Sequence, residues 1–334
     1  MNLQRYVIPC IAVLLPATTL AAEPYEPPRT EYGRPDLQGY WTNASLTNLQ
    51  RFGRYDGLVI PHDQIEAVTA ANAQVVRAET DDGLVPGELL DGSDLAQGRG
   101  YNAFWVDPGT SYGLVKGEYR SSWIIDPPSG RIPFSEEGNR LRREHRAQFG
   151  SDDGPEGRSL GERCIIGFGS TGGPPMNNVL YNNLYQIVQT NDYVVILVEM
   201  VHDARIIPIG SKGAPHRPAE HQPWLGDSIG WWEGDTLVVE TVNLHWQQAP
   251  FNSAPLSAQG RIIEKFTRYS DEQILYEFEV EDPVYYTASW KGEMSLNHSD
   301  EMLYEYACHE GNYGLIGILA GARRQELDGA GESP

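Results

Sequence analysis

Alternating apolar and polar residues recur in short runs through the second half of the chain, which is the pattern of half-buried β-strands. Tyr276, Phe278 and Val280, for example, alternate with glutamates. Turn-forming pairs such as Asn191-Asp192 separate successive runs and indicate hairpins. We expect strands over 184–189, 193–201, 205–209, 229–233, 236–243, 261–269, 273–281, 285–296 and 302–308.

These runs predict a mainly β protein with a few peripheral helices. About nine strands in sequence order form an antiparallel meander, and its closure into a barrel or strongly curved sheet removes exposed strand edges. A helix is expected over 62–80, which follows Pro61 and contains neither Gly nor Pro. A second helix begins after Ser135, a residue type favoured at helix N-termini, and a third covers 313–327.

Composition divides the chain of 334 residues into segments with different predicted roles. Arg5, the apolar run 6–20 and the small residues Ala21 and Ala22 are typical of a secretory signal peptide. We therefore expect a periplasmic or secreted protein whose mature chain begins near Ala22 or Glu23. The predicted segments are a signal peptide over 1–22, an extended Pro-rich lead-in over 23–39, a mixed region packing on the barrel over 40–160, the barrel over 161–312, and a C-terminal helix and tail over 313–334.

Cys164 and Cys308 are the cysteines that remain after removal of the signal peptide. An even pair in an oxidising compartment predicts a disulfide, and two buried free thiols are the alternative. Neither cysteine belongs to a C-x-x-C pair, so a metal site built on their sulfurs is disfavoured.

The charge balance and the missing motifs exclude several classes of function. Lys and Arg number 25 against 46 Asp and Glu, a formal charge of −21, which repels nucleic acids and anionic lipid surfaces. No run beyond the signal peptide reaches the roughly 20 apolar residues of a membrane span. The glycines of 167–173 lead into Pro174-Pro175 rather than a helix, so they do not form a dinucleotide-binding loop. We expect a small-molecule ligand or substrate, no nucleic acid, no cofactor and no metal, and predict no oligomeric state.

Ionisable residues interrupt the apolar strand pattern in 199–205. Glu199, His202, Asp203 and Arg205 are costly to bury unless they are paired. One interpretation is an acid–base group at the mouth of the barrel, with Glu199 in substrate binding. The alternative is a bridge between Arg205 and a carboxylate at a strand end, with His202 in a loop.

A second polar cluster follows Cys308. If that cysteine is in a disulfide, His309, Glu310, Asn312 and Tyr313 are held at one rim of the barrel, the last two as substrate-binding residues. Alternatively, the polar residues satisfy backbone groups of a glycine-containing turn before the helix. Zinc binding by histidines and glutamates of both clusters is a further alternative, although their spacing matches no metal motif.

Tryptophans are the candidate aromatic wall of the site. Trp224 follows a Pro-rich loop that also holds His216 and His221, and long loops over a rigid scaffold often line binding sites. Trp232 and its neighbour Trp231 point to opposite faces of a strand, so one of them can face a cavity. We expect Trp224 and Trp232 to contact the substrate, with core and turn positions as the alternative.

Several motifs mark a family resemblance: PDLQGYWTN (35–43), EMVHDAR (199–205), WLGD (224–227), WEGDTLVVET (232–241), EDP (281–283) and YEYACHEGNY (304–313). Together they resemble a widespread family of exported bacterial proteins with no assigned activity. The resemblance covers most of the mature chain and implies no catalytic residue. The meander is also similar to calycin or lipocalin-like barrels, a likeness of architecture alone.

These observations favour an exported enzyme that performs cofactor-independent acid–base chemistry on a small, partly apolar molecule, as a lyase, hydratase, isomerase or hydrolase. His202 and His309 would be its general acid and base, Arg205 would stabilise developing negative charge, and Asp203 or Glu310 would orient an imidazole. The alternative is a lipocalin-like carrier with an apolar cavity and no chemistry. Convergence of both histidines and Arg205 on one pocket favours the enzyme, whereas scattered positions favour the carrier. A structural envelope protein, the third candidate, would have no pocket.

Overall fold

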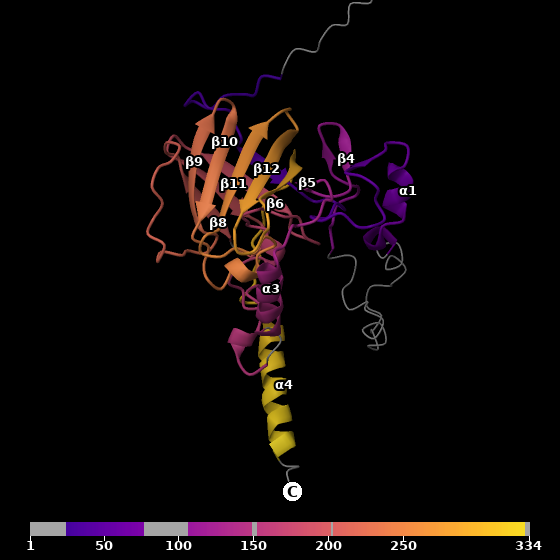
Figure 1. The fold of residues 1–334 in the computed structure, drawn as a ribbon, viewed down its shortest axis with the longest axis vertical. Helices are drawn as coiled ribbons and strands as arrows, with labels where there is room; N and C mark the ends of the chain where they lie inside the picture. The colour runs from indigo at the N-terminus through magenta and orange to yellow at the C-terminus, as the bar shows by residue number, and fades with distance from the viewer. Residues whose placement is uncertain (1–24, 77–105, 149–151, 202, 331–334) are drawn as a thin grey trace, which may run out of the picture.

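Antiparallel strands form a nearly closed, barrel-like sheet, which confirms the mainly β fold predicted from the alternation (Figure 1). The computed structural model describes residues 25–76, 106–148, 152–201 and 203–330. The predicted signal peptide and His202 lie outside these residues. The strands of the sheet are β1 (Gly39–Thr42), β5 (Ile124–Asp126), β6 (Leu184–Gln189), β7 (Tyr193–Val198), β8 (Ala204–Pro208), β9 (Asp227–Glu233), β10 (Thr236–Val242), β11 (Arg261–Arg268), β12 (Gln273–Glu281) and β13 (Trp290–His298).

Hairpins account for most neighbours in this sheet. The spatial order is β8-β7-β6-β1-β13-β12-β11-β10-β9, and β5 pairs with β13 beside this path. Strands β6 to β8 therefore form one meander and β9 to β13 another. The short strand β1 joins the two meanders because it pairs with both β6 and β13.

Strand β12 illustrates how the alternating sequence becomes a barrel wall. Tyr276, Phe278 and Val280 are buried, whereas the glutamates between them are half-buried on the other face. On β13, Gly292 lies opposite Phe278, and a Cβ at this glycine would lie 2.2 Å from the phenylalanine ring. The glycine therefore allows the ring to pack against the neighbouring backbone.

The edge strands β8 and β9 meet at one end of the barrel. Ile209 forms a parallel bridge with Gly230, and the Gly210 N–H donates to the Gly230 carbonyl at 2.8 Å. Along the rest of the described edges, β8 and β9 are not paired with each other. The wall is thus interrupted beside 204–208 and 225–229.

Side chains and one loop fill the inside of the barrel. Large side chains that are fully buried include Trp41, Phe266, Trp290 and Met294. The loop that precedes β6 also enters, since the Met176 N–H donates to the Tyr276 hydroxyl at 2.9 Å. The Tyr185 hydroxyl donates to the Thr171 carbonyl of the same loop at 3.0 Å. Protein atoms therefore occupy the region where a lipocalin-like barrel would hold its ligand.

Helices and a small sheet lie outside the barrel (Figure 1). These elements are β2 (Val59–Ile60), α1 (Ile65–Ala70), β3 (Leu114–Val115), β4 (Glu118–Arg120), α3 (Glu136–Gln148), α4 (Tyr313–Ala330) and the 3₁₀ helices η3 (Pro155–Gly157), η4 (Phe168–Ser170) and η5 (Ala249–Phe251). Strands β2, β4 and β3 form a three-stranded sheet. The Gly138 N–H donates to Ser135 Oγ at 2.8 Å, which confirms Ser135 as the N-cap of α3. Figure 1 shows α4 extending away from the barrel.

One predicted strand ends early at the residues that the sequence singled out for chemistry. The strand expected over 193–201 stops at Val198, and β8 begins at Ala204. Val201 has a φ of 64°, a left-handed conformation that breaks strand geometry. Glu199 and Asp203 therefore lie between these two strands rather than within one.

Two other predicted elements also differ from the structure. The run 302–308 is irregular rather than a strand. Its apolar residues are not buried on one side, since Tyr304, for example, is 75% exposed. Helix α1 is shorter than the helix expected over 62–80. Asn72 Oδ1 accepts the Gln74 N–H at 2.9 Å, a contact that starts a new turn soon after α1 ends. Residues 77–80 lie outside the described chain.

Candidate functional site

Arg205 lies inside the barrel in a buried ion pair. Its Nη1 and Nη2 donate to the Glu264 carboxylate on β11 at 2.8 and 2.5 Å. The Tyr276 hydroxyl donates to the same carboxylate at 2.7 Å. Burial favours a lower pKa for Arg205, but the adjacent Glu264 charge outweighs it and the pKa is raised. Arg205 is therefore a paired cation, as the bridge interpretation expects, and its catalytic role stays a prediction.

Asp203 and Glu199 lie at the two ends of the β7–β8 hairpin turn. The Gly167 N–H donates to Asp203 Oδ2 at 2.7 Å. A Cβ at Gly167 would lie 3.2 Å from that oxygen, so glycine allows the backbone to approach the carboxylate. At the other end, the Leu184 N–H donates to Glu199 Oε2 at 3.2 Å, and burial raises the pKa of Glu199.

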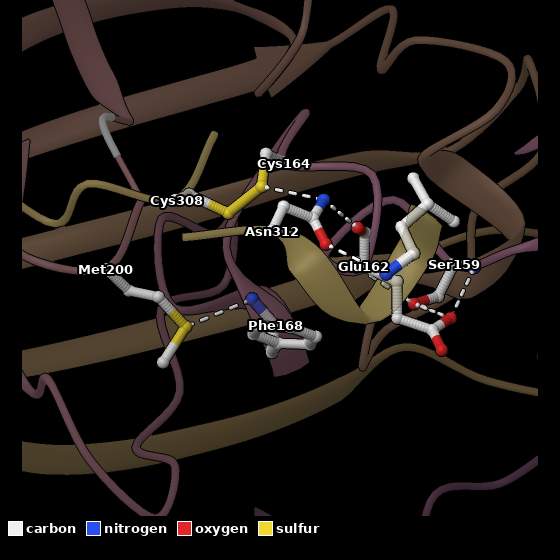
Figure 2. Close-up of a disulfide and its surroundings, with 8 residues drawn as sticks. Ser159, Glu162, Cys164, Phe168, Met200, Cys308 and Asn312 are labelled. Carbon is white, nitrogen blue, oxygen red and sulfur yellow. Dashed lines mark hydrogen bonds between the residues drawn. A yellow bond between two sulfur atoms is a disulfide. The ribbon is translucent and has the colours of Figure 1, made fainter. Parts of the chain in front are cut away.

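The disulfide between Cys164 and Cys308, with an S–S distance of 2.02 Å, confirms the predicted pairing. Figure 2 shows Asn312 beside it, where Nδ2 donates to the Glu162 carbonyl at 2.8 Å and to Cys164 Sγ at 3.4 Å. Asn312 Oδ1 also accepts the Leu315 N–H at 3.3 Å. Asn312 therefore caps α4 and fixes the start of this helix to the disulfide.

A groove of about 410 Å³ lies beside this disulfide, and we call it the disulfide groove. Its lining residues are Gly161, Glu162, Cys164, Phe168, Tyr306, Ala307, Cys308, Gly311, Asn312, Gly314, Leu315 and Ile318. The Phe168 N–H donates to Met200 Sδ at 3.1 Å, which brings the β7–β8 hairpin close to the groove (Figure 2). His309 and Glu310 occupy the exposed turn next to the groove and are not among its lining residues. Tyr313 is 77% exposed at the start of α4.

The interruption between β8 and β9 forms a second cavity of about 350 Å³, which we call the seam pocket. Its lining residues are Ala204, Arg205, Ile206, Pro208, Pro215, Arg217, Pro223, Trp224, Leu225, Gly226, Asp227, Ser228 and Ile229. Arg205 and Trp224, both predicted site residues, are among them. Apolar side chains and polar atoms both contribute substantially to the wall, and Arg217 and Asp227 add charged groups.

Asp227 fixes the loop 210–226 to the start of β9. Its Oδ2 accepts the Arg217 N–H at 2.8 Å and lies 3.0 Å from His216 Nδ1. His216 Nε2 lies 3.2 Å from Glu240 Oε1 on β10. Each ring nitrogen of His216 therefore lies beside a carboxylate oxygen. These contacts place Arg217 at the wall of the seam pocket.

Trp224 is held in place by His245, which follows β10. The two rings stack with a centroid distance of 3.7 Å. The Gln247 N–H donates to His245 Nδ1 at 3.2 Å, so the neutral imidazole carries its hydrogen on Nε2. Burial lowers the pKa of His245, which favours this neutral form. The stack gives the seam pocket a positioned aromatic wall.

The structure places the predicted site residues in different parts of the molecule. Arg205 and Trp224 line the seam pocket, Asn312 lines the disulfide groove, and His309 lies on the turn beside that groove. Trp232 is half-buried on β9 and packs against the hydrophobic core. Arg205 and His309 therefore share neither of these two cavities.

Three residues that shape these sites were not predicted from the sequence. Arg217 lies in the Pro-rich loop that the sequence did single out, next to His216, so this loop was the available signal. His245 follows a strand and carries no local motif. Glu264 is 59 residues from Arg205, and only the fold brings the two together.

The described residues contain no group of three or more His, Cys, Asp or Glu that could hold a metal ion. Within the same ranges, no helix is long and apolar enough to cross a membrane. Comparisons with protein-family models, curated proteins and solved structures found no match. The resemblance to a family of exported proteins therefore stays a prediction.

Proposed function

We propose that the mature, exported protein binds a small organic molecule in the seam pocket. The observation that carries this proposal is the combination of the stacked Trp224 ring with positioned polar groups in one cavity of about 350 Å³. Cavities of roughly 300–1,000 Å³ with apolar walls and a few polar groups are typical of small-molecule sites. The filled barrel supports this location, because the interior has protein atoms where a lipocalin-like carrier would hold its ligand.

A thermal-shift screen of small organic molecules against the mature protein tests this proposal. Compounds that bind the folded state raise the melting temperature by mass action. The variant Trp224→Ala should weaken their binding roughly 10-fold or more, since a buried aromatic contact is commonly a dominant contribution. Tyr304→Ala is the control, because Tyr304 is an aromatic residue that is 75% exposed and is not among the lining residues of either cavity. A screen without binders, or binders unaffected by Trp224→Ala, would contradict the proposal.

Acid–base catalysis beside the same pocket is a second candidate, and the contacts of His216, which lies between the lining residues Pro215 and Arg217, favour it. Asp227 orients this imidazole through Nδ1 at 3.0 Å, as carboxylates do for catalytic histidines. A substrate that displaced Glu240 would lie against Nε2 of this imidazole. For a bound compound that is converted, His216→Gln should lower turnover by roughly 10²–10⁴ and retain binding. Unchanged turnover would reject this role.

The sequence predicts His202 and His309 as an acid–base pair, and of these two His309 belongs to the described residues, on the turn beside the disulfide groove. His309→Ala tests it with the same compounds, because His309 is exposed and its loss should leave stability nearly unchanged. If His309→Ala lost turnover and His216→Gln did not, the result would indicate that the reaction takes place at the disulfide groove rather than at the seam pocket.

A further inference from the structure

Resting on the proposed function, we infer that the ligand of the seam pocket is a small organic monocarboxylate with an apolar body. Its carboxylate would bind the Arg217 guanidinium, and its apolar part would contact Trp224 and the aliphatic wall. The inference follows from the donors, the charges and the apolar surface of this one cavity.

Arg217 is the donor that the pocket offers to a ligand. Among the described residues, its guanidinium uses Nη1 to donate to His221 Nε2 at 2.6 Å and Nε in an ion pair with Asp227 Oδ1 at 3.8 Å. The Nη2 group is left for a ligand, and the side chain is 64% exposed. The backbone at this residue is fixed on both sides, because its N–H donates to Asp227 and its carbonyl accepts Asn243 Nδ2 at 3.1 Å. A fixed guanidinium loses little freedom when it binds a carboxylate through two hydrogen bonds.

The other charged groups of the pocket already have partners. Asp227 accepts the Arg217 N–H at 2.8 Å and lies 3.0 Å from His216 Nδ1, so its carboxylate already has partners on the protein. Arg205 also lines the pocket, but its Nη1 and Nη2 bind Glu264 inside the barrel. Arg205 Nε has no hydrogen-bond partner among the described residues, but this side chain is 1% exposed, so Arg217 is the pocket cation that is exposed to a ligand anion.

The apolar wall explains why the ligand needs an apolar body. Ile206 is 64% exposed on β8 although it lines the cavity, and Trp224 from the loop 210–226 lines the same cavity. Pro215 and Pro223 extend this surface and offer no N–H to a polar ligand. Covering such a surface contributes about 25 cal/mol per Å² of apolar area removed from water.

The net charge of the chain restricts the anion to a single charge. With −21 overall, the protein repels each additional negative charge on a ligand, so phosphate dianions and polyanions are disfavoured relative to a monocarboxylate. A neutral ligand avoids this repulsion but cannot form the charge-assisted bonds of a carboxylate with Arg217.

Titration calorimetry with matched pairs of probes tests the inference. The probes are naphthalene-2-carboxylate, 4-phenylbutanoate and hexanoate, each with its primary amide, and phenyl phosphate as the dianion. At least one carboxylate should bind the mature protein roughly 10- to 100-fold more tightly than its amide, which is the usual effect of one charge-assisted pair. Arg217→Gln should remove this preference, and Lys212→Gln should retain it. Lys212 lies in the same loop, 2.9 Å from Glu233, and outside the pocket.

The outcomes separate the inference from the proposed function. Equal binding of acid and amide, with both weakened in Trp224→Ala, would refute the inference that the ligand is a carboxylate. The proposal that the seam pocket binds a small molecule would stand. Tighter binding of phenyl phosphate than of every carboxylate would also refute the inference of a carboxylate. If no acid or amide binds, two claims are refuted for ligands of this size: that the ligand is a carboxylate, and that the seam pocket binds a small organic molecule. The melting temperature of Arg217→Gln is measured alongside, since a folded variant must show the loss of preference.

Discussion

Removal of one partner from the Arg205–Glu264 pair should destabilise the protein far more than replacement of both. The two side chains are 1% and 0% exposed, so a charge left alone at either position has neither water nor a counter-ion. Breaking a buried pair in this way typically costs about 3–5 kcal/mol of unfolding free energy. We therefore expect that loss for Arg205→Met and for Glu264→Leu separately.

The double variant Arg205→Met/Glu264→Leu leaves no unpaired charge in the barrel. Its cost should come mainly from the Tyr276 hydroxyl, which loses its acceptor at 2.7 Å but still accepts the Met176 N–H at 2.9 Å. An unsatisfied buried donor costs about 1–3 kcal/mol. The single losses together amount to about 6–10 kcal/mol, so the two sites should be coupled by at least about 3 kcal/mol.

Urea unfolding followed by circular dichroism, with the disulfide intact, measures these free energies. The proteins compared are the wild type, the two single variants and the double variant. The dependence of unfolding free energy on urea concentration should be the same in all four, which makes their free energies comparable. A double variant that loses the sum of the two single losses would refute the reasoning, because the pair would then contribute no coupling. A single variant that loses less than about 1 kcal/mol would show that water reaches this position.

Three further predictions concern other contacts. Serine at both Cys164 and Cys308 should lower the unfolding free energy by about 2–5 kcal/mol, since the disulfide spans 144 residues, and thiol titration of the unreduced wild type should find no free thiol in the mature chain. Gly138→Ala should cost about 1–3 kcal/mol in thermal unfolding, because its Cβ would lie 2.3 Å from the Tyr285 carbonyl oxygen; an unchanged melting temperature would contradict this packing. Burial lowers the pKa of His245, so the unfolded chain binds its proton at higher pH and stability should fall as pH drops below about 6.5; an identical decline in His245→Phe would assign the effect elsewhere.

Local sequence patterns predicted those helices and strands that are specified by residues within the element itself. The bounds of β12 match the alternating run because one face of that strand is buried along its length. Ser135 was predicted as an N-cap because its side chain bonds a backbone N–H three residues ahead. Strand β1 was not predicted, since Gly39–Thr42 is short and is stabilised by partners more than 140 residues away, such as Tyr185 opposite Trp41. Pairing over such distances leaves no periodic signal in the sequence.

Contacts between residues distant in the sequence were also not predictable in the candidate site. The sequence placed Arg205 near a carboxylate and proposed neighbours in the same segment, whereas the fold supplies Glu264 from β11. Alternation explains the error: in a barrel, an inward side chain of one strand meets inward side chains across the interior, and these come from distant strands. Which strand lies across depends on sheet order, and that order was not predictable from hairpin signals alone.

The seam pocket follows from the same topology. The loop 210–226 connects the two edge strands, and Pro215 and Pro223 cannot donate to a ladder, so strand pairing does not continue through it. Pairing between β8 and β9 is therefore confined to the bridge at Ile209 and Gly230, and the wall stays open where the prolines and Trp224 lie. Residues that prevent complete closure of the barrel are thus the residues that line its cavity. Protein atoms fill the interior of this barrel, and the cavity at the incomplete wall is therefore the place where we propose that a ligand binds.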